Sequence, residues 1–281
     1  MEMTVKGLDP YYQEYTAPSA ILRYSKATAG YGIGYLLEHD YKRVYLDAVR
    51  TMKTGATNGG LQILEFGCGA GMNLVHLMSV LRREGVQVRR ALGTDFSPTL
   101  IDAARKDARS YLPKDDQSKV EFYVGKNETL VNDLCTALRQ PRKELLREFD
   151  LILSVNTVRY CHRSNTQVNC AKDLFDLLKS GGVCVNIDMS DRFLFFRSSF
   201  RPGAREKKKK GREAYLPSLQ EYAAPFEQVG FEILKKEHFC WIPHSASALM
   251  CIGLSAASPV LNVVARSRAM RSLVVVRKPA V

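Results

Sequence analysis

Short apolar runs alternate along the chain with segments in which apolar residues recur at helical spacing. From residue 61 onward the apolar runs predict seven strands, over residues 61–66, 88–94, 120–124, 149–155, 183–188, 231–236 and 272–277. The segments of helical spacing predict helices over residues 71–83, 97–110, 167–179 and 218–229. This alternation is typical of βαβ units. The expected fold is therefore α/β, a doubly wound, seven-stranded, mostly parallel sheet with helices on both faces.

Two local signals predict where helices begin and end. Ser97 and Pro98 offer an N-cap and a first-turn proline for the second predicted helix. Gly181 and Gly182 follow the third predicted helix, and glycine is the usual residue at a helix end. We therefore expect that helix to end near residue 179, with the fifth strand starting directly after the glycines.

Three segments depart from the regular alternation. Residues 1–55 are rich in tyrosine and show helical spacing around residues 33–49, which predicts an N-terminal helical lid before a domain of residues 56–281. Insertions into that domain are expected at about residues 189–216 and 240–268. Residues 246–265 carry no charge, yet their serines, proline and asparagine make them too polar for a membrane span. We expect a late helical cap over a substrate pocket, or an oligomer contact.

The net charge of +12 comes mostly from one segment of the chain. Residues 192–212 contain nine Lys or Arg and one acid, so this segment supplies +8 of the total. Four phenylalanines lie beside these charges, and such a mixture can stack on bases or bind an anionic surface. The run Lys207–Lys210 taken alone is equally typical of a solvated loop.

Cysteine usage and the amino terminus indicate a reducing compartment. The seven cysteines are scattered without CxxC pairs, which argues for free thiols, and neither they nor the acids and histidines show metal-ligand spacing. The first residues are charged and aromatic, unlike a secretory signal. We therefore expect a cytoplasmic protein with no transmembrane segment and no metal site.

The most informative motif lies where the first predicted strand gives way to a helix. There the chain reads Glu65-Phe66-Gly67-Cys68-Gly69-Ala70-Gly71. Glycines at such a turn let the backbone approach a ligand closely and adopt angles that other residues resist. In a doubly wound sheet the ligand lies across the carboxyl ends of the strands, where the strand order reverses.

This motif resembles that of the class I S-adenosylmethionine (SAM)-dependent methyltransferases, in which an acidic residue precedes a GxGxG loop. The resemblance covers about residues 61–188 and the later strands 231–277. It implies SAM as cofactor, S-adenosylhomocysteine (SAH) as product, and Asp95 as the acid that holds the ribose. The residues expected to bind the cofactor are Glu65, Gly67, Cys68, Gly69, Gly71, Asn73, Asp95, Phe96, Ser97, Asn127, Glu128, Asn156, Tyr15 and Arg23.

A nucleotide-dependent dehydrogenase is the nearest alternative to this interpretation. Its GxGxxG fingerprint requires glycine where this chain has Met72. In the methyltransferases an aspartate after the third strand often contacts the adenine. This chain has Asn127 and Glu128 in that region, so the contact is expected from one of them or from the backbone.

Methyl transfer from a sulfonium is an in-line displacement, so alignment and exclusion of water are the main tasks of the enzyme. A general base is needed only if the nucleophile carries a proton. Three residues are catalytic candidates: His162 in the loop predicted after the fourth strand, Asp188 at the end of the fifth strand, and His244 at the start of the late insertion. Thr157 and Val158 replace the two prolines typical of enzymes that methylate amino nitrogens.

Three functions remain open on the sequence. The leading one is methylation of a small molecule on oxygen, nitrogen or carbon, with an acceptor that is anionic or partly apolar. The second is RNA methylation with the basic insertion as the nucleic-acid grip. The third is a non-catalytic subunit that binds a partner, and a homodimer is compatible with each of them.

Overall fold

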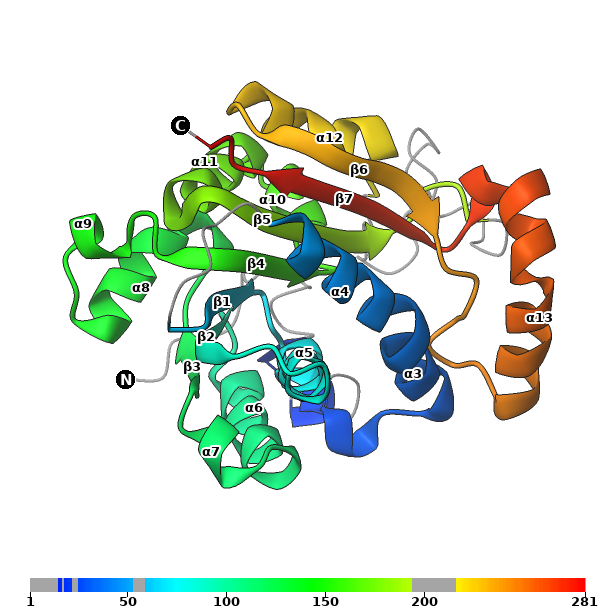
Figure 1. Ribbon diagram of the computed structural model, residues 1–281, viewed down its shortest axis with the longest axis horizontal. Coiled ribbons are helices and arrows are strands. Elements are labelled where there is room, and N and C mark those ends of the chain that lie inside the picture. The colour runs from blue at the N-terminus through cyan, green and yellow to red at the C-terminus, as the bar shows by residue number, and fades with distance from the viewer. Residues whose placement is uncertain (1–14, 17, 22–24, 53–58, 194–215, 281) are drawn as a thin grey trace, which may run out of the picture.

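The computed structural model of the 281-residue chain describes residues 15–16, 18–21, 25–52, 59–193 and 216–280 (Figure 1). Its centre is a seven-stranded sheet with the order β3-β2-β1-β4-β5-β7-β6. The strands are β1 (Leu61–Phe66), β2 (Val88–Asp95), β3 (Val120–Val124), β4 (Phe149–Val155), β5 (Leu178–Met189), β6 (Glu232–Phe239) and β7 (Arg271–Arg277). Only β7 runs antiparallel to its neighbours, so the predicted mostly parallel sheet is confirmed.

The strand order reverses between β1 and β4, which lie side by side at the centre of the sheet. A doubly wound sheet binds its ligand at this point, beyond the carboxyl ends of the strands. The glycine loop after β1, Asp95 at the end of β2 and Asn156 after β4 all lie at this edge. Because β7 is antiparallel, its first residue, Arg271, lies at the same edge.

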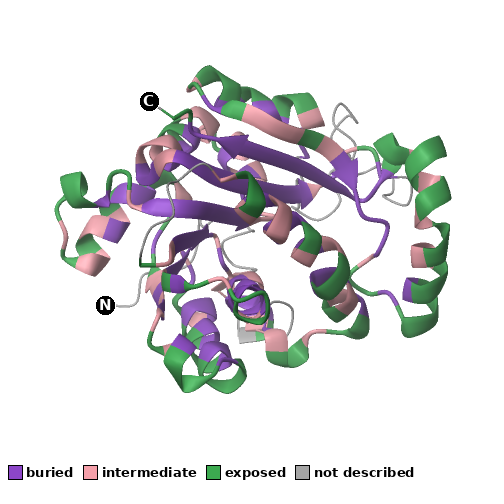
Figure 2. Cartoon of the chain, in the orientation of Figure 1, coloured by how far each residue is buried: buried purple, intermediate pink, exposed green. Residues whose placement is uncertain are grey.

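Helices cover both faces of the sheet, as predicted (Figure 1). One face packs against α4 (Lys42–Thr51), α5 (Met72–Arg83) and α6 (Pro98–Tyr111), and the other packs against α8 (Leu130–Leu138), α11 (Gln167–Leu177) and α12 (Leu219–Gln228). The central strands β1, β4, β5 and β7 are buried almost throughout, whereas the edge strands β3 and β6 are partly exposed (Figure 2). Shorter helices are α3 (Tyr31–Leu36), α7 (Lys114–Gln117), α9 (Arg142–Leu145) and α10 (Val158–Arg163).

The helical part of the N-terminal segment packs on the sheet itself. Helix α3, a π-helical turn (Leu37–Tyr41) and α4 follow one another without a break. Tyr41 and Tyr45 are buried in the same core as the apolar residues of α5 and of β5. Of the four tyrosines between residues 31 and 45, these two pack in the core and Tyr35 packs partly against it, whereas Tyr31 is exposed.

Two local predictions are wrong. Helix α11 ends at Leu177 and is not closed by Gly181 and Gly182, because the glycines belong to an irregular start of β5 whose pairing with β4 shifts between Phe149 and Leu151. There the Gly181 N–H donates to the carbonyl of Lys278 at 2.9 Å, a strand contact that no local pattern reveals. The segment after β4, expected as a loop through His162, becomes helix α10 from Val158 onward.

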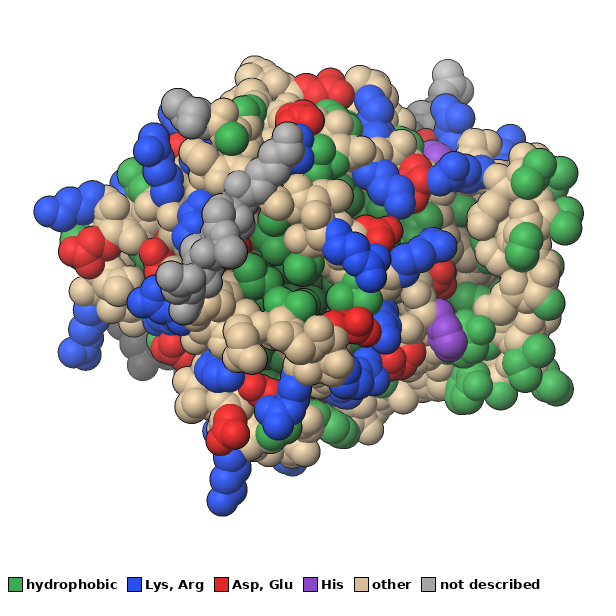
Figure 3. Space-filling view, in the orientation of Figure 1, with side chains coloured by type: hydrophobic (Ala, Val, Ile, Leu, Met, Phe, Trp, Pro, Cys, Tyr) green, Lys and Arg blue, Asp and Glu red, His purple; other side chains and the backbone are tan. Residues whose placement is uncertain are grey.

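The late insertion forms a long helix, α13 (Ala248–Val264), at the side of the molecule opposite α8 and α9 (Figure 1). Its only buried residue is Cys251, whereas Leu249 and Val263 are 82% and 85% exposed. The exposed apolar side chains of α13 appear in green at the right-hand edge of Figure 3. Within the residues that the structure describes, no helix, α13 included, combines the length and apolar character needed to cross a membrane.

Candidate functional site

The glycine loop has the backbone conformation that its sequence predicts. Gly67, Gly69 and Gly71 have φ angles of 63°, 55° and 74°, in the left-handed region that other residues resist. A side chain on Gly71 would also collide with Phe122, whose Cε1 lies 2.8 Å from an ideal Cβ position. Cys68 anchors the loop to the next strand through its N–H, which donates to the Thr94 carbonyl at 2.8 Å.

Asp95 joins the ends of β1 and β2. Its Oδ2 accepts the N–H of Gly69 at 2.9 Å, and its Oδ1 accepts the N–H of Ser97 at 2.9 Å. A carboxylate has about four acceptor positions, so two of them stay open for ribose hydroxyls. Burial raises the pKa of this carboxyl, while the two backbone donors oppose that rise. Asp95 therefore shapes the glycine loop as well as offering acceptors to a ligand.

Tyr15 brings the N-terminal segment over this edge of the sheet. Its carbonyl accepts from Ser97 Oγ at 2.7 Å, and its ring packs edge-on against Phe96 with 5.9 Å between centroids. On its other side its hydroxyl lies 2.5 Å from the hydroxyl of Tyr160 on α10. Tyr15 thus spans from the end of β2 to the residues after β4. Arg23, the other N-terminal candidate, lies outside the described residues.

Glu65 lies at the end of β1 with a buried side chain. Its Oε1 accepts from Nδ2 of Asn73 at 3.3 Å, whereas its Oε2 is buried without a hydrogen-bond partner. Burial raises the pKa of this carboxyl to about 8, against the opposing effect of Asn73 and a backbone N–H. An unsatisfied acidic oxygen beside a glycine loop is suited to a cationic ligand group.

These residues fit an adenosyl sulfonium with a methionine tail. The left-handed glycines form a cradle without side chains, Asp95 has acceptors for the ribose, and Glu65 has a free oxygen for the ammonium group. Asn127 and Glu128 lie just after β3, beside the end of β2, which is the side expected for the adenine. Among the described residues no cluster of His, Cys, Asp and Glu could hold a metal ion.

The residues after β4 and β5 form a second polar group next to the glycine loop. Thr157 Oγ1 donates to the Gly67 carbonyl at 3.2 Å, which holds Asn156 beside the loop. On the following helix, Arg159 forms an ion pair of 3.1 Å with the buried Asp188 and donates to the Tyr160 hydroxyl at 3.0 Å. Asp188 thus has a permanent cationic partner.

The other two catalytic candidates lie in different surroundings. His162 stacks on Tyr222 of α12, with 6.1 Å between ring centroids, and burial lowers its pKa. His244 contacts the guanidinium of Arg271 through Nε2. Burial, followed by the charges of Arg271 and Arg159, lowers the pKa of His244 to about 3. Both histidines are therefore neutral at physiological pH, and His244 is a weak base.

Three residues of this edge were not among the candidates from the sequence, Arg159, Tyr160 and Arg271, and Thr157 was considered only as a replacement for a proline. Arg159 and Tyr160 lie in the segment after β4 that was predicted as a loop containing His162, but an arginine and a tyrosine in a predicted loop have no signature of their own. Arg271 precedes the strand predicted over residues 272–277 and is the first residue of β7. Its location depends on β7 running antiparallel between β5 and β6.

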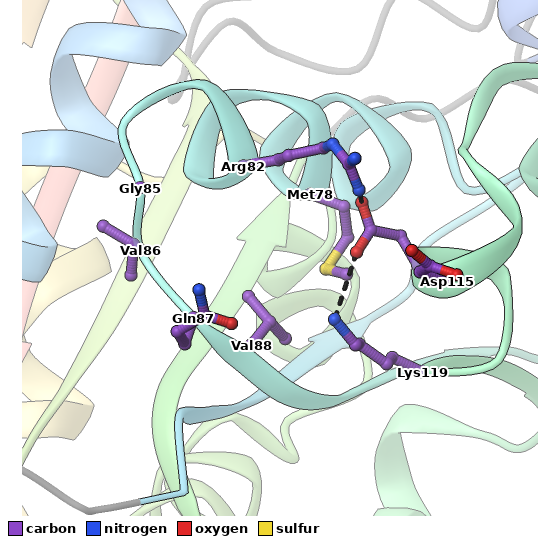
Figure 4. Close-up of a pocket in the computed structure, with 9 residues that line it drawn as sticks. Met78, Arg82, Gly85, Val86, Gln87, Val88, Asp115 and Lys119 are labelled. Carbon is purple, nitrogen blue, oxygen red and sulfur yellow. Dashed lines mark hydrogen bonds and ion pairs between the residues drawn. The ribbon is translucent and has the colours of Figure 1, made fainter.

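A hollow lies at the opposite edge of the sheet, between the end of α5 and the start of β2 (Figure 4). Its volume is about 380 Å³. Asp116 there accepts from Arg82 at 3.0 Å and from Lys119 at 3.2 Å, so the carboxylate of Asp116 is already paired. We regard this hollow as a surface feature unconnected with the glycine loop.

A doubly wound sheet with this strand order, a left-handed glycine loop after β1 and an acid at the end of β2 defines a class I SAM-dependent methyltransferase. A family model described as a methyltransferase domain matches residues 57–237. The chain therefore belongs to this methyltransferase family, and SAM is its cofactor. No curated protein matches the chain.

Solved structures with the same fold are distant in sequence. The CMeT domain of the citrinin polyketide synthase superposes with a TM-score of 0.58 at 18% identity, over 98% of this chain and 60% of that one. A SAM-dependent methyltransferase from Mesorhizobium loti gives 0.55 at 17% identity, over 86% and 97%. The cyclase SpnF gives 0.53 at 15% identity, over 85% and 82%. At these identities the likeness shows the fold alone.

Proposed function

We propose that this methyltransferase acts on a small-molecule acceptor, which is held between Tyr160, Asn156 and the segment that carries His244. The observation that carries the proposal is the burial of the polar group beside the glycine loop. Asp188 and Arg271 are almost completely covered, by α10 on one face and by residues 240–246 on the other. A small molecule can be enclosed at such a site, whereas a polymer requires an open groove.

The charged groups at this site favour an acceptor that needs little help from a base. Asp188 is engaged by Arg159, and His244 has a pKa of about 3 because burial and two neighbouring arginines disfavour its protonated form. When bound, the cofactor supplies an activated methyl group on a sulfonium, which leaves as a neutral sulfide. The protein then has to orient the nucleophile and exclude water, tasks for which Tyr15, Tyr160 and Asn156 are placed.

The cofactor residues extend this proposal. Glu65 and Asn73 would hold the amino group of the methionine part, and Asp95 would hold the ribose. Phe96, Ser97, Asn127 and Glu128 would surround the adenine. The N-terminal segment, proposed as a lid over residues 1–55, would close over the cofactor at Tyr15, where the contacts with Ser97 and Tyr160 support it.

Transfer of a labelled methyl group from SAM tests the proposed function. The purified protein is incubated with methyl-labelled SAM and either the low-molecular-weight fraction of a cell extract or the RNA of that extract. We expect label in the small-molecule fraction, and loss of this turnover in Asp95→Asn. Since the same fold is found in a cyclase, turnover and not binding decides. Labelled RNA without labelled small molecules would contradict the proposal.

The RNA alternative makes a separate prediction about salt. A protein that neutralises several phosphates with the basic segment 192–212 loses affinity steeply as salt rises, by about a thousandfold between 50 and 200 mM for six contacts. Activity on a small acceptor should change little over the same range. A partner-binding subunit without catalysis would bind SAM but would produce no SAH at either salt concentration.

Location and assembly belong to the same proposal. A cytoplasmic protein is supported by seven free cysteines, six of which are buried. A homodimer is supported by the exposed apolar side chains of α13. Reducing conditions should accordingly leave activity unchanged, because the protein has no disulfide to lose.

A further inference from the structure

Arg271 is a buried cation that pairs with no carboxylate among the described residues. Its side chain is 1% exposed. Nη1 donates to Oδ1 of Asn156 at 3.1 Å and Nη2 contacts Nε2 of His244, both of them neutral groups. Nε is buried without an acceptor. Because a guanidinium carries five N–H donors, most of its capacity for an anion is unused.

The other end of the same strand provides a direct comparison. Arg277, the last residue of β7, is also buried, and its guanidinium binds both carboxylate oxygens of Glu232, at 2.8 and 2.6 Å. Arg159, on α10 near the proposed acceptor position, pairs with Asp188. Charged residues are almost never fully buried unless they are paired, because their desolvation costs more than neutral contacts return. Arg271 departs from this rule at the functional edge of the sheet.

The surroundings of Arg271 match a carboxylate attached to an apolar body. Its strand neighbours on the same face are Met189 of β5 and Phe239 of β6. Tyr41 packs on Phe239, with 6.2 Å between ring centroids, and its hydroxyl is a second buried group without a hydrogen-bond partner. A cation, an unsatisfied hydroxyl and two apolar side chains thus lie together.

The location of Arg271 points to the methyl acceptor. Asn156 links Arg271 to Thr157, whose hydroxyl bonds to the glycine loop at Gly67. The group therefore lies next to the cofactor site, on the side of β4, β5 and β7. The acids and open acceptors suited to the cofactor, by contrast, lie on the side of β1 and β2.

We propose that Arg271 binds a carboxylate of the methyl acceptor, supported by Asn156, and that the acceptor is a small organic acid with an apolar body. This inference rests on the proposed methylation of a small molecule. A charge-assisted bond to a carboxylate is about twice as strong as a bond to a neutral group, so the carboxylate takes over the contact that His244 makes in this structure. The short segment that carries His244 moves aside for it.

Benzoate binding to the SAH-loaded protein tests this inference, with benzamide as the neutral isostere. Calorimetry should detect benzoate binding to the wild-type protein and weaker binding of benzamide. Arg271→Gln should lower benzoate affinity about tenfold or more, the effect of losing hydrogen bonds to a charged group, while SAH affinity stays within about twofold. The matched control is Arg268→Gln, an exposed arginine three residues earlier, which should bind benzoate like the wild type.

Two further readouts separate this role from others. His244→Ala should keep or strengthen benzoate binding, because the competing imidazole is gone. Arg271→Gln should unfold at the same temperature as the wild type or higher, because it removes an unpaired buried charge. A lower unfolding temperature for Arg271→Gln, with benzoate binding intact, would show a structural role and overturn the inference.

The remaining outcomes separate the failure of this inference from the failure of the proposed function. Loss of SAH affinity in Arg271→Gln would assign the arginine to the carboxylate of the cofactor and overturn its assignment to the acceptor. Equal binding of benzoate and benzamide, or no benzoate binding to a protein that binds SAH, would overturn the inference and leave the proposed function intact. Failure of the wild-type protein to bind SAH would instead contradict the proposed function itself.

Discussion

The side chain of Thr157 fills the space that a side chain on Gly67 would need. A Cβ built on Gly67 would lie 2.3 Å from Cγ2 of Thr157, a distance at which one of the two residues must move. The glycine loop after β1 and the residues after β4 therefore meet without any gap. This contact joins the glycine loop, where the cofactor binds, to the residues after β4, where the acceptor is proposed to bind.

Gly67→Ala should consequently weaken SAH binding severely. The alanine would have both a φ angle of 63° and a collision with Thr157, a combination that typically costs about 1–3 kcal/mol of stability. Thermal unfolding and calorimetry with SAH measure the two effects. Gly253→Ala is the control, because this α13 glycine has open space around it. That variant should gain about 0.5–1 kcal/mol through helix propensity. Normal SAH binding by Gly67→Ala would contradict the geometry.

Glu65 should make stability depend on pH. Its folded pKa of about 8 lies above the usual value of about 4.3, so between these values the folded state holds a proton that the unfolded state has released. The stabilising effect is complete below the unfolded pKa and is lost as pH rises through the folded one. Urea unfolding of Glu65→Gln should therefore show a flatter profile between about pH 5 and pH 8 than the wild type. Parallel profiles would mean that Glu65 is ionised in the folded protein.

Asp95→Asn should weaken both the loop and the cofactor site. An amide has one acceptor oxygen where the carboxylate has two, so either the Gly69 N–H or the Ser97 N–H loses its partner. We expect a loss of about 1–3 kcal/mol in stability and of about tenfold or more in SAH affinity. Asp102→Asn, an exposed position on α6, is the control and should change neither quantity.

Asp188→Asn should destabilise the fold and leave the pH profile of turnover nearly unchanged. Removing this carboxylate leaves Arg159 without its buried partner, a change that typically costs about 3–5 kcal/mol. The double variant with Arg159→Met should recover much of the loss, because no unpaired charge is left. Unfolding in urea tests both. A stable Asp188→Asn that had lost turnover would instead indicate a general base.

Helix α13 should mediate self-association. Leu249 and Val263 are largely exposed apolar residues on a helix without charges. Light scattering of the wild-type protein should give twice the chain mass of 31.6 kDa, and Leu249→Glu with Val263→Glu should return it to a monomer. Leu146→Glu, at an exposed apolar position between α9 and β4, is the control that should remain dimeric. A monomeric wild type would remove this role from α13.

The sequence by itself determined the sheet and predicted the cofactor side of the site. Both depend on local pattern: a buried strand is a short apolar run, and the turn after β1 needs glycines at the alternate positions 67, 69 and 71. Asp95 was predicted from the resemblance to the methyltransferase family, in which an acid ends the strand that pairs with β1. These features involve neighbours along the chain or neighbouring strands in a common topology, so periodicity and motif spacing were enough.

Only the tertiary structure brings together the residues of the proposed acceptor side. Arg271 is separated from Asn156 by 115 positions and Tyr15 from Tyr160 by 145, so no local spacing relates them. Their encounter follows from β7 inserting antiparallel next to β5, and from the N-terminal segment crossing the ends of the strands. The burial that makes Arg271 unusual is likewise a property of the packed molecule, because a charge at the start of a strand is ordinary until the chain folds over it.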